Sequence, residues 1–363
     1  MLLLVVSEQA LSGPAISQCD REGNTDMLVV TGGAGFIGSN LVKALNQRGR
    51  TDIVVVDDLS DTRKVKNLSD LEIADYIDKD DFLRRCDELN RMTPIECVFH
   101  QGACSDTMVE DGRFVMSVNY DYSKALLAFC QQRAIPLIYA SSASVYGLHG
   151  PFTESADRFK PLNAYAYSKT LFDQYAWQPS LTPASQLVGL RYFNVYGPGE
   201  QHKGRMASVA WHLTHQYFET GKVKLFSGTG GYGDGEQRRD FIHVDDAVRA
   251  NLFFLDHPKK SGVFNVGTGT SRSFNDVALA VINACRDVDG LAALSLDDAR
   301  SQEVLSYYEM PQTLKGKYQS FTEASVEKLR TEGFDGRFID VAEGVGSYAT
   351  LIYQELSSGS ALS

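Results

Sequence analysis

The feature that most constrains the fold is a glycine-rich turn that follows a short apolar run at residues 27–30. The turn holds Gly32, Gly35 and Gly38, and a helix-like apolar pattern runs from residue 37 to residue 45. A strand that ends in such a turn lets backbone N–H groups approach a pyrophosphate at the positive end of the next helix. Glycine-rich turns also have purely structural uses. The turn therefore predicts a dinucleotide site only if residues further along the chain supply matching chemistry.

Short β-branched runs alternate with helical patterns through the first two hundred residues. We expect strands at residues 27–31, 53–57, 97–101, 137–141 and 187–193, and helices that include residues 37–47, 122–133 and 165–177. This alternation predicts an α/β fold with a doubly wound parallel sheet of the Rossmann type. Ligands of such a sheet bind at the carboxyl ends of the strands.

The pattern becomes irregular after Gly197, which favours a second, smaller region. Residues 228–235 are mostly glycine and must form a loop, and residues 339–356 form an amphipathic helical pattern. We expect residues 27–197 to form a dinucleotide-binding domain and residues 198–363 to form mainly a substrate-binding domain, mostly helical. A return segment around residues 239–266 should rejoin the main sheet at least once, through residues 241–244 or 263–266.

Charge and cysteine usage limit the class of protein. The net charge is −11 with scattered basic residues, so neither nucleic acid nor a membrane surface is an expected partner. The six cysteines lack metal-site spacing, which predicts reduced thiols, no metal and a cytoplasmic location. Residues 1–26 contain no secretory signal and read as a disordered appendage, and no later run is long enough to span a membrane.

Tyr165 and Lys169 lie four residues apart in a helical pattern, so they share one helix face. Such a pair is common on surface helices, but here Ser142 ends the strand upstream. A tyrosine hydroxyl becomes a useful base when a nearby ammonium stabilises its phenolate, and a serine hydroxyl can hydrogen-bond the reacting oxygen. The order of glycine turn, strand-end serine and Tyr/Lys helix resembles the short-chain dehydrogenase/reductase superfamily.

Further motifs narrow this resemblance to the extended branch that modifies nucleotide sugars. They are residues 141–147 (SSASVYG), 191–198 (RYFNVYGP), 238–246 (RRDFIHVDD) and 264–269 (FNVGTG). Three segments, 101–105 (QGACS), 202–208 (HKGRMAS) and 314–319 (LKGKYQ), closely resemble the ADP-L-glycero-D-manno-heptose 6-epimerase family. The resemblance extends from Met27 to about Tyr353.

The resemblance implies inversion of C6 of the heptose in ADP-D-glycero-D-manno-heptose, a step in lipopolysaccharide inner-core synthesis. It implies a tightly bound NADP, a transient 6-keto intermediate and one acid–base group on each face of the ketone. Tyr165 and Lys203 match that pair, although a lysine in a loop can also be merely solvated or contact a pyrophosphate. Family members are homo-oligomers, pentameric in known cases, and act on this small-molecule substrate.

The family's cofactor contacts carry over to positions near the strand ends. They are Gly32, Gly35, Phe36, Ile37, Gly38, Asp57, Asp58, Lys64, Lys79, Gln101, Gly102, Ala103, Cys104, Ser105, Asn119, Lys169 and Val195. Asp58 departs from the expected pattern, since a neutral amide would suit the 2′-phosphate of NADP better than a second carboxylate. NAD therefore stays open beside NADP.

The family's substrate contacts fall mainly in the second half of the chain. They are Ser142, Asn194, Lys203, Arg205, His212, Phe226, Ser227, Gly228, Thr229, Arg239 and Tyr318. Arg239 suits a diphosphate because its planar fork can bond two oxygens at once. His212 could equally be structural. The glycine-rich stretch is longer than the family needs, so the register from Thr229 to residue 238 stays open.

Three other functions share many of these residues. A UDP-hexose 4-epimerase would have the superfamily set without a role for Lys203. A dehydratase of this branch would place an acidic residue after the serine, where Ala143 and Ser144 stand. A non-catalytic NADP-sensing module would keep the fold but usually loses the Tyr or the Lys, and both Tyr165 and Lys169 are present.

Overall fold

A computed structural model describes residues 26–148, 150–155, 157, 159–312 and 318–359 of the chain. Apart from residue 26, the expected N-terminal appendage lies outside these residues, and so do residues 314–317 of the heptose-epimerase motif at 314–319. Among the described residues, no helix is both long and apolar enough to cross a membrane.

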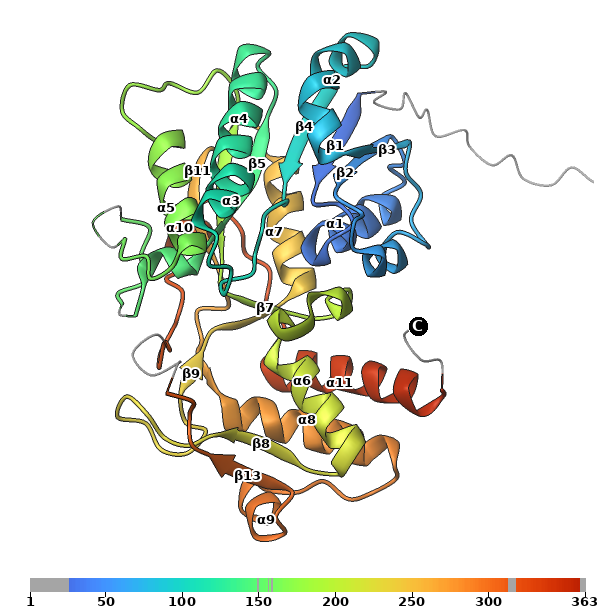
Figure 1. The fold of residues 1–363 in the computed structure, drawn as a ribbon, viewed down its shortest axis with the longest axis vertical. Coiled ribbons are helices and arrows are strands. Elements are labelled where there is room, and N and C mark those ends of the chain that lie inside the picture. Colours follow the sequence, from blue (N-terminus) through green and yellow to red (C-terminus); the bar gives the residue numbers. More distant parts are fainter. Residues whose placement is uncertain (1–25, 149, 156, 158, 313–317, 360–363) are drawn as a thin grey trace, which may run out of the picture.

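The centre of the fold is a parallel sheet of seven strands (Figure 1). In spatial order the strands are β11 (Gly262–Val266), β6 (Leu187–Tyr192), β5 (Leu137–Ser142), β4 (Ile95–His100), β1 (Met27–Thr31), β2 (Ile53–Asp57) and β3 (Asp75–Asp78). From β1 the chain runs outward through β2 and β3, then crosses back to β4. The order therefore reverses between β1 and β4, where such sheets bind their ligands. The predicted doubly wound sheet is confirmed.

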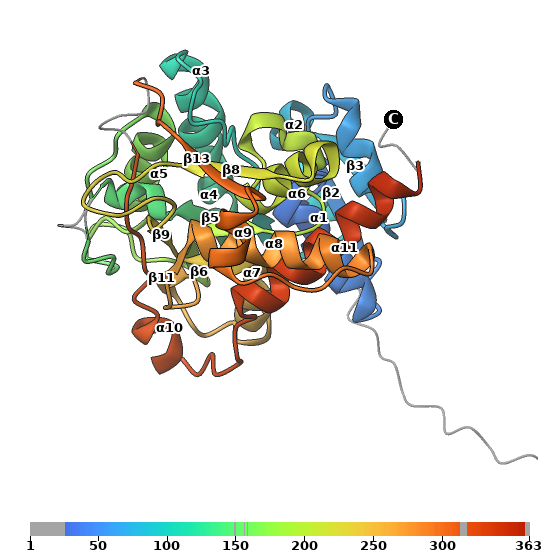
Figure 2. The same ribbon diagram turned by 90° about the horizontal axis from the view of Figure 1, so that it is seen from below.

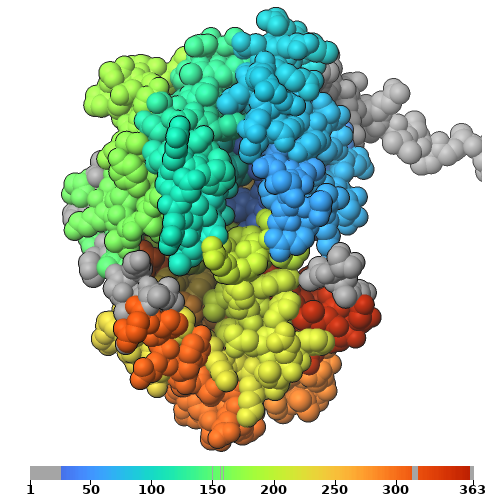
Figure 3. Space-filling model, viewed as in Figure 1, coloured from blue at the N-terminus to red at the C-terminus, as the bar shows by residue number. Residues whose placement is uncertain are grey.

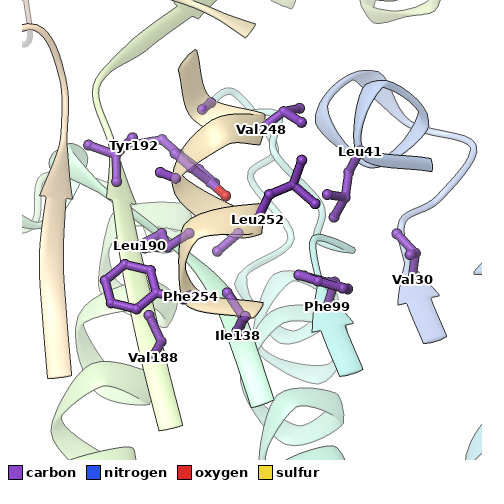
Figure 4. Close-up of a cluster of buried hydrophobic side chains, with 14 of the residues drawn as sticks. Val30, Leu41, Phe99, Ile138, Val188, Leu190, Tyr192, Val248, Leu252 and Phe254 are labelled. Carbon is purple, nitrogen blue, oxygen red and sulfur yellow. The ribbon is translucent and has the colours of Figure 1, made fainter. Parts of the chain in front are cut away.

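Helices cover both faces of this sheet, and together they form the sheet body. One face is covered by α1 (Phe36–Gln47), α7 (Val244–Asp256) and α10 (Glu327–Thr331), and the other by α2 (Lys79–Met92), α4 (Tyr122–Gln132) and α5 (Ala164–Ala176). Leu41 of α1 and Leu252 of α7 point at the sheet and belong to one buried cluster with Phe99 and Ile138 (Figure 4). Burying each such side chain stabilises the fold by about 1.5–3 kcal/mol.

The sequence patterns missed β3 and α2. β3 is a short edge strand with aspartates at both ends, so it lacks the apolar run that marks the inner strands. α2 is strongly polar, but Phe82 and Cys86 lie four residues apart and are both buried against the sheet. That spacing was a weak but readable helical signal.

Other elements of the second half of the chain form a smaller helical body below the sheet body in Figure 1. Its helices are α6 (Val209–Thr220), α8 (Phe274–Val288), α9 (Leu296–Ser301) and α11 (Val341–Ser357), with the parallel pair β8 (Val223–Phe226) and β13 (Leu305–Tyr308). Figure 2 shows α8 and α11 side by side, and their apolar faces share one core with α6. The amphipathic C-terminal helix and the 228–235 loop are confirmed.

The chain returns from the helical body to the main sheet through β11, which pairs with β6. The other candidate, residues 241–244, does not join that sheet. Its strand β10 (Phe241–His243) pairs instead with β7 (Asn194–Tyr196) at the junction of the two bodies. A last short pair, β9 (Arg238–Arg239) with β12 (Arg272–Ser273), lies nearby.

Candidate active site

A cleft of about 820 Å³ lies between the two bodies at the carboxyl ends of the strands. Figure 3 shows a hollow there, with the dark blue of the beginning of the chain at its floor and the yellow-green helical body below it. Eighteen of the residues expected to act in catalysis or binding line this cleft. They are Gly32, Gly35, Phe36, Ile37, Gly38, Asp57, Lys64, Gln101, Gly102, Ala103, Cys104, Ser105, Ser142, Tyr165, Lys169, Asn194, Val195 and Lys203.

The glycine turn joins β1 to α1 at the floor of the cleft. Gly32 adopts a φ of +68°, and a Cβ there would come within 2.5 Å of the Gly102 nitrogen, so this position requires glycine. Gly35 is the N-cap of α1, and no acidic residue stands in the first turn of the helix. The positive end of α1 is therefore open to an anion. This arrangement fits the diphosphate of a dinucleotide.

Asp57 at the end of β2 holds the turn in place. Its carboxylate accepts the Ala34 N–H at 2.8 Å, and its other oxygen accepts Lys64 Nζ at 2.9 Å. Lys64 stands in the 3-10 helix η1 (Thr62–Asn67) and also donates to the Asp58 carbonyl oxygen at 2.9 Å. The Asp58 carboxylate itself accepts the Ser60 N–H, and hydrogen bonds with Ser60 hold its pKa below the usual range. Asp58 is thus ionised and does not line the cleft.

Tyr165, Ser142 and Lys169 meet at the end of β5. The helix α5 begins where Asn163 accepts the Ala166 N–H at 2.8 Å, and this places Tyr165 in its first turn. Burial raises the pKa of Tyr165, while a hydrogen bond with Ser142 lowers it. One turn later Lys169 Nζ donates to the Ala140 carbonyl oxygen at 2.8 Å, and burial lowers its pKa to about 8.

Asn119 is buried beside the cleft rather than in its lining. It lies in a π-helical turn, η2 (Ser117–Asp121), between α3 (Gly112–Met116) and α4. Its amide accepts the Cys104 N–H at 2.7 Å and donates to the Cys104 carbonyl at 3.0 Å and to Ser168 Oγ at 3.1 Å. Asn119 therefore ties the chain after β4, which lines the cleft, to the helix that carries Tyr165.

Lys203 enters the cleft from the other body. It lies in the 3-10 turn η5 (Gln201–Met206), with its Nζ 5.0 Å from the centre of the Phe36 ring. Burial lowers the pKa of Lys203, and the nearby Glu200 carboxylate raises it. Tyr165 and Lys203 thus reach one cleft from separate elements, α5 and η5.

Three of the expected substrate contacts form a cluster just outside the cleft. The Arg239 guanidinium lies 4.8 Å from the ring centre of Tyr318 and 5.6 Å from that of Phe274, and Phe226 packs edge-on against Tyr318. Arg239 also donates to the Gln319 carbonyl oxygen. Phe274 and Gln319 line the cleft, so the cluster borders it.

The remaining expected residues do not line the cleft. Lys79 pairs with Asp80 at 2.8 Å, and Arg205 pairs with Asp106, itself a lining residue, at 2.7 Å. His212 lies in the first turns of α6. Ser227, Gly228 and Thr229 follow β8 in the glycine-rich loop, which closes on itself where Gly228 N–H meets Asp234 Oδ1 at 2.7 Å.

Several lining residues were not predicted as site residues. His202 lies beside Lys203 in the lining, and burial lowers the pKa of His202 to about 4. Met206, Ala207 and Ser208 continue the same loop, and the motif at 202–208 marked this segment. Gln319 and Thr322 come from distant sequence that folds over the cleft; Gln319 ends the motif at 314–319, whereas no local pattern pointed to Thr322.

The described residues contain no group of three or more His, Cys, Asp or Glu side chains placed to hold a metal ion. Five cysteines in the same part of the chain are free, and four of them are buried: Cys86, Cys97, Cys130 and Cys285. The fifth, Cys104, is half-buried in the cleft, where burial raises its pKa.

The family and the relatives that this chain matches are nucleotide-sugar epimerases and related enzymes. Residues 28–267 match the NAD dependent epimerase/dehydratase family. The chain is 55% identical over 326 residues to ADP-L-glycero-D-manno-heptose-6-epimerase of Thiobacillus denitrificans, covering 90% of this chain and 98% of that protein. The crystal structure of the Helicobacter pylori ADP-L-glycero-D-manno-heptose-6-epimerase is similar with a TM-score of 0.74 and 30% identity, over 91% of this chain and 96% of that one. Thermus thermophilus UDP-glucose 4-epimerase, solved with NAD, is similar with a TM-score of 0.71 and 26% identity, over 90% and 99% of the two chains.

Proposed function

Because the chain belongs to the NAD dependent epimerase/dehydratase family, we propose that it is an isomerase that inverts C6 of the heptose in ADP-D-glycero-D-manno-heptose. The product is ADP-L-glycero-D-manno-heptose, a precursor of the lipopolysaccharide inner core. The 55% identity to a protein of that name over 90% of the chain supports the choice of substrate. The structural observation that supports the proposal is that Tyr165 and Lys203 both line one cleft.

Inversion through a ketone needs a proton acceptor for one epimer and a proton donor for the other. Tyr165 removes the C6 hydroxyl proton of one epimer while the Lys203 ammonium stands ready to protonate the ketone oxygen. For the other epimer Lys203 is the base and Tyr165 the acid. Ser142 holds the C6 oxygen by a hydrogen bond and supports the Tyr165 phenolate, as its contact with that hydroxyl allows.

The cleft residues fit a nicotinamide dinucleotide. The turn at Gly32 and Gly35 and the open end of α1 suit its diphosphate, since a Cβ at Gly32 would close the approach. Asp57 would reach a ribose, and Lys169 would hold the nicotinamide ribose. When bound, the cofactor would take a hydride from C6 and give it back to the opposite face, so no net oxidation results. We assign NADP because Lys64 and Lys79 offset the charge of Asp58.

The sheet body and the helical body bind different ligands in the proposed reaction. Residues 27–197 with the segment 239–266 bind the cofactor, and residues 198–363 mainly bind the sugar nucleotide. The diphosphate of ADP-heptose meets Arg239, and the Tyr318 and Phe226 rings pack beside it. Asn194, Arg205, His212 and the 227–229 segment complete the substrate contacts. We also propose a cytoplasmic homo-oligomer, a pentamer by family resemblance.

The test is proton NMR of ADP-D-glycero-D-manno-heptose incubated with the purified protein and no added cofactor. Appearance of the L-glycero isomer is the expected result, because retained NADP would be recycled within each turnover. UDP-glucose serves as the parallel substrate, and its conversion to UDP-galactose without heptose turnover would instead support a 4-epimerase. Bound nicotinamide with no turnover of either sugar nucleotide would refute both.

A further inference from the structure

We propose that Glu200 is a positioning residue for Lys203, because its buried carboxylate ties together the two ends of the turn that carries Lys203. The inference rests on the proposed function, in which Lys203 is one of the two acid–base groups. Sequence reasoning did not single out Glu200, which precedes the motif at 202–208 and is fully buried.

Glu200 grips the far end of the turn with both carboxylate oxygens. Ser208 donates its N–H to Oε2 at 2.6 Å and its O–H to Oε1 at 2.6 Å. Ser208 is also the N-cap of α6, so the carboxylate sits at the positive end of that helix. Within the loop, Lys203 N–H donates to the Glu200 carbonyl oxygen at 2.9 Å. One residue therefore closes the loop of residues 201–207 and sets the path of its backbone at Lys203.

The near end of the turn is held by the sheet body. Asn40 of α1 donates to the Pro198 carbonyl at 2.8 Å, and Asn67 of η1 donates to the Gly199 carbonyl at 3.0 Å. Inside the turn, Gln201 donates to Asn67 and Arg205 pairs with Asp106, while a side chain at Gly204 would meet open space among the described residues. The Glu200 carboxylate joins the end held by the sheet body to the end held by α6.

The negative charge of Glu200 also acts on Lys203. Burial raises the pKa of Glu200, while Lys203 and the Ser208 hydrogen bonds lower it. The other groups here are the Phe36 ring over Lys203, His202 beside it in η5, and Tyr348 of α11, which faces Glu200. Among these groups, the Glu200 carboxylate is the one that raises the pKa of Lys203 and so favours its ammonium form.

The test is the pH profile of epimerisation by Glu200→Gln, which keeps the shape of the side chain and removes its charge. In the proposed reaction the active enzyme has one of Tyr165 and Lys203 protonated and the other deprotonated. Loss of the Glu200 charge lowers the pKa of Lys203, so the pH optimum moves toward lower pH. We expect kcat to fall about tenfold or more because the turn is held less well, and the optimum to move down by at least about 0.5 pH unit.

A matched control is Glu323→Gln. Glu323 also accepts two bonds from one serine, Ser271 N–H at 2.9 Å and Ser271 Oγ at 2.8 Å, both on its Oε2, but it does not line the cleft. Its variant should keep the wild-type optimum. Should Glu200→Gln fail to fold, Glu200→Asp keeps the charge but shortens the reach, and should lower kcat without moving the optimum.

The outcomes separate the two proposals. The role of Glu200 is overturned if Glu200→Gln keeps the wild-type kcat and pH optimum, or if Glu200→Asp keeps the wild-type kcat. Either result leaves the epimerase function standing. A wild-type protein that does not epimerise ADP-heptose overturns both. An acid shift found in Glu200→Gln and absent in Glu323→Gln supports the inference.

Discussion

Tyr165 is the residue whose protonation bears most directly on the proposed reaction. Burial raises the pKa of Tyr165 above its ordinary value and a hydrogen bond with Ser142 lowers it in part, while Lys169 lies one turn away on the same helix. The phenolate therefore depends on its neighbours. The protonation state of Lys203 also depends on its surroundings, because burial lowers its pKa and Glu200 raises it.

We predict that Tyr165→Phe and Lys203→Met each lower kcat by about 10²-fold or more, because each removes one of the two acid–base groups. Cofactor should remain bound, since neither group anchors the diphosphate. The assay is NMR of both epimers, with nicotinamide content read by absorbance. Tyr167→Phe is the control, because Tyr167 stands two residues away on α5 and is 50% exposed. Near-normal turnover by either variant would contradict the two-base assignment.

A second prediction concerns the choice between NADP and NAD. Lys64 Nζ bonds the Asp57 carboxylate at 2.9 Å, at the strand end where a ribose would lie. Lys64→Met should weaken NADP binding about tenfold and change NAD binding much less, because only NADP carries the 2′-phosphate. Fluorescence titration of both cofactors measures this, with Lys66→Met, an exposed lysine of the same turn, as control. Equal or tighter binding of NAD by the wild type would count against NADP.

At the scale of elements, α5 is locked to the sheet by a buried ion pair behind the catalytic strand. Asp173 accepts Arg191 Nε at 2.9 Å, Ser141 Oγ at 2.8 Å and Tyr139 OH at 2.9 Å. Both partners of the pair are only 2% exposed. The carboxylate thus joins α5 to β5 and β6 at Ser141, the neighbour of Ser142, and one helical turn after Lys169.

We predict that Asp173→Asn destabilises the fold by about 3–5 kcal/mol, because it leaves the Arg191 charge buried without a partner. Urea unfolding gives the free energy. Asp256→Asn is the control, since its pair with Arg48 is about half exposed and should cost about 1 kcal/mol or less. Similar losses in the two variants would mean that burial does not matter here.

A buried histidine links β4 to the glycine turn and to α4. His100 Nδ1 lies 2.6 Å from Thr31 Oγ1 and Nε2 lies 2.8 Å from Ser123 Oγ, which itself donates to the Asn119 carbonyl. Because the Ser123 hydroxyl is already donating, it accepts from His100 Nε2–H, and Nδ1 accepts from Thr31. Burial first, and Lys169 second, lower the pKa of His100 to about 3. The ring is therefore neutral in the folded chain.

This shift predicts how stability depends on pH. Below pH 6.5, the ordinary pKa of histidine, His100 binds a proton in the unfolded chain but stays neutral in the folded chain. The free energy of unfolding therefore falls as the pH falls from about 6.5 to about 3. One such group costs about 2 kcal/mol between pH 7 and pH 5. Urea unfolding at the two pH values should therefore show a loss that is about 2 kcal/mol smaller in His100→Asn than in the wild type. Equal losses in both proteins would refute the assignment.

How well each element could be predicted depends on the range of the interactions that fix it. The glycine turn and the helix of Tyr165 and Lys169 follow from local spacing, and both were predicted. Asn119 was carried over only by resemblance, and the π-helical turn that aims it at Cys104 has no sequence signature. Glu200 was missed because its partner Ser208 looks like any helix N-cap until the loop is closed.

At the scale of the whole molecule, the sheet body is completed by residues from the second half of the chain. β11 covers the edge of β6, and α7 buries Val248, Leu252 and Phe254 against Leu190 and its neighbours (Figure 4). The sequence pointed to a return segment but could not distinguish β10 from β11. Both are short apolar runs, and only their pairing partners, far away in sequence, differ.

We predict that a fragment of residues 27–197 aggregates when expressed alone, because it exposes both the edge of β6 and the face that α7 covers. Size-exclusion chromatography beside the full chain tests this. A monodisperse fragment that binds nicotinamide cofactor would contradict the prediction.

The position of β11 also sets an order of events during synthesis. A ribosome delivers the chain from its N-terminus, so the glycine turn, Asp57 and the Tyr165 helix all emerge before the strand and helix that close their sheet. Residue 266 lies nearly three-quarters of the way along the chain of 363 residues. Until then the nascent polypeptide carries an open edge and an uncovered apolar face, the surfaces that chaperones recognise. The dinucleotide cleft is therefore a late product of translation, although the motif that announces it is among the first to be made.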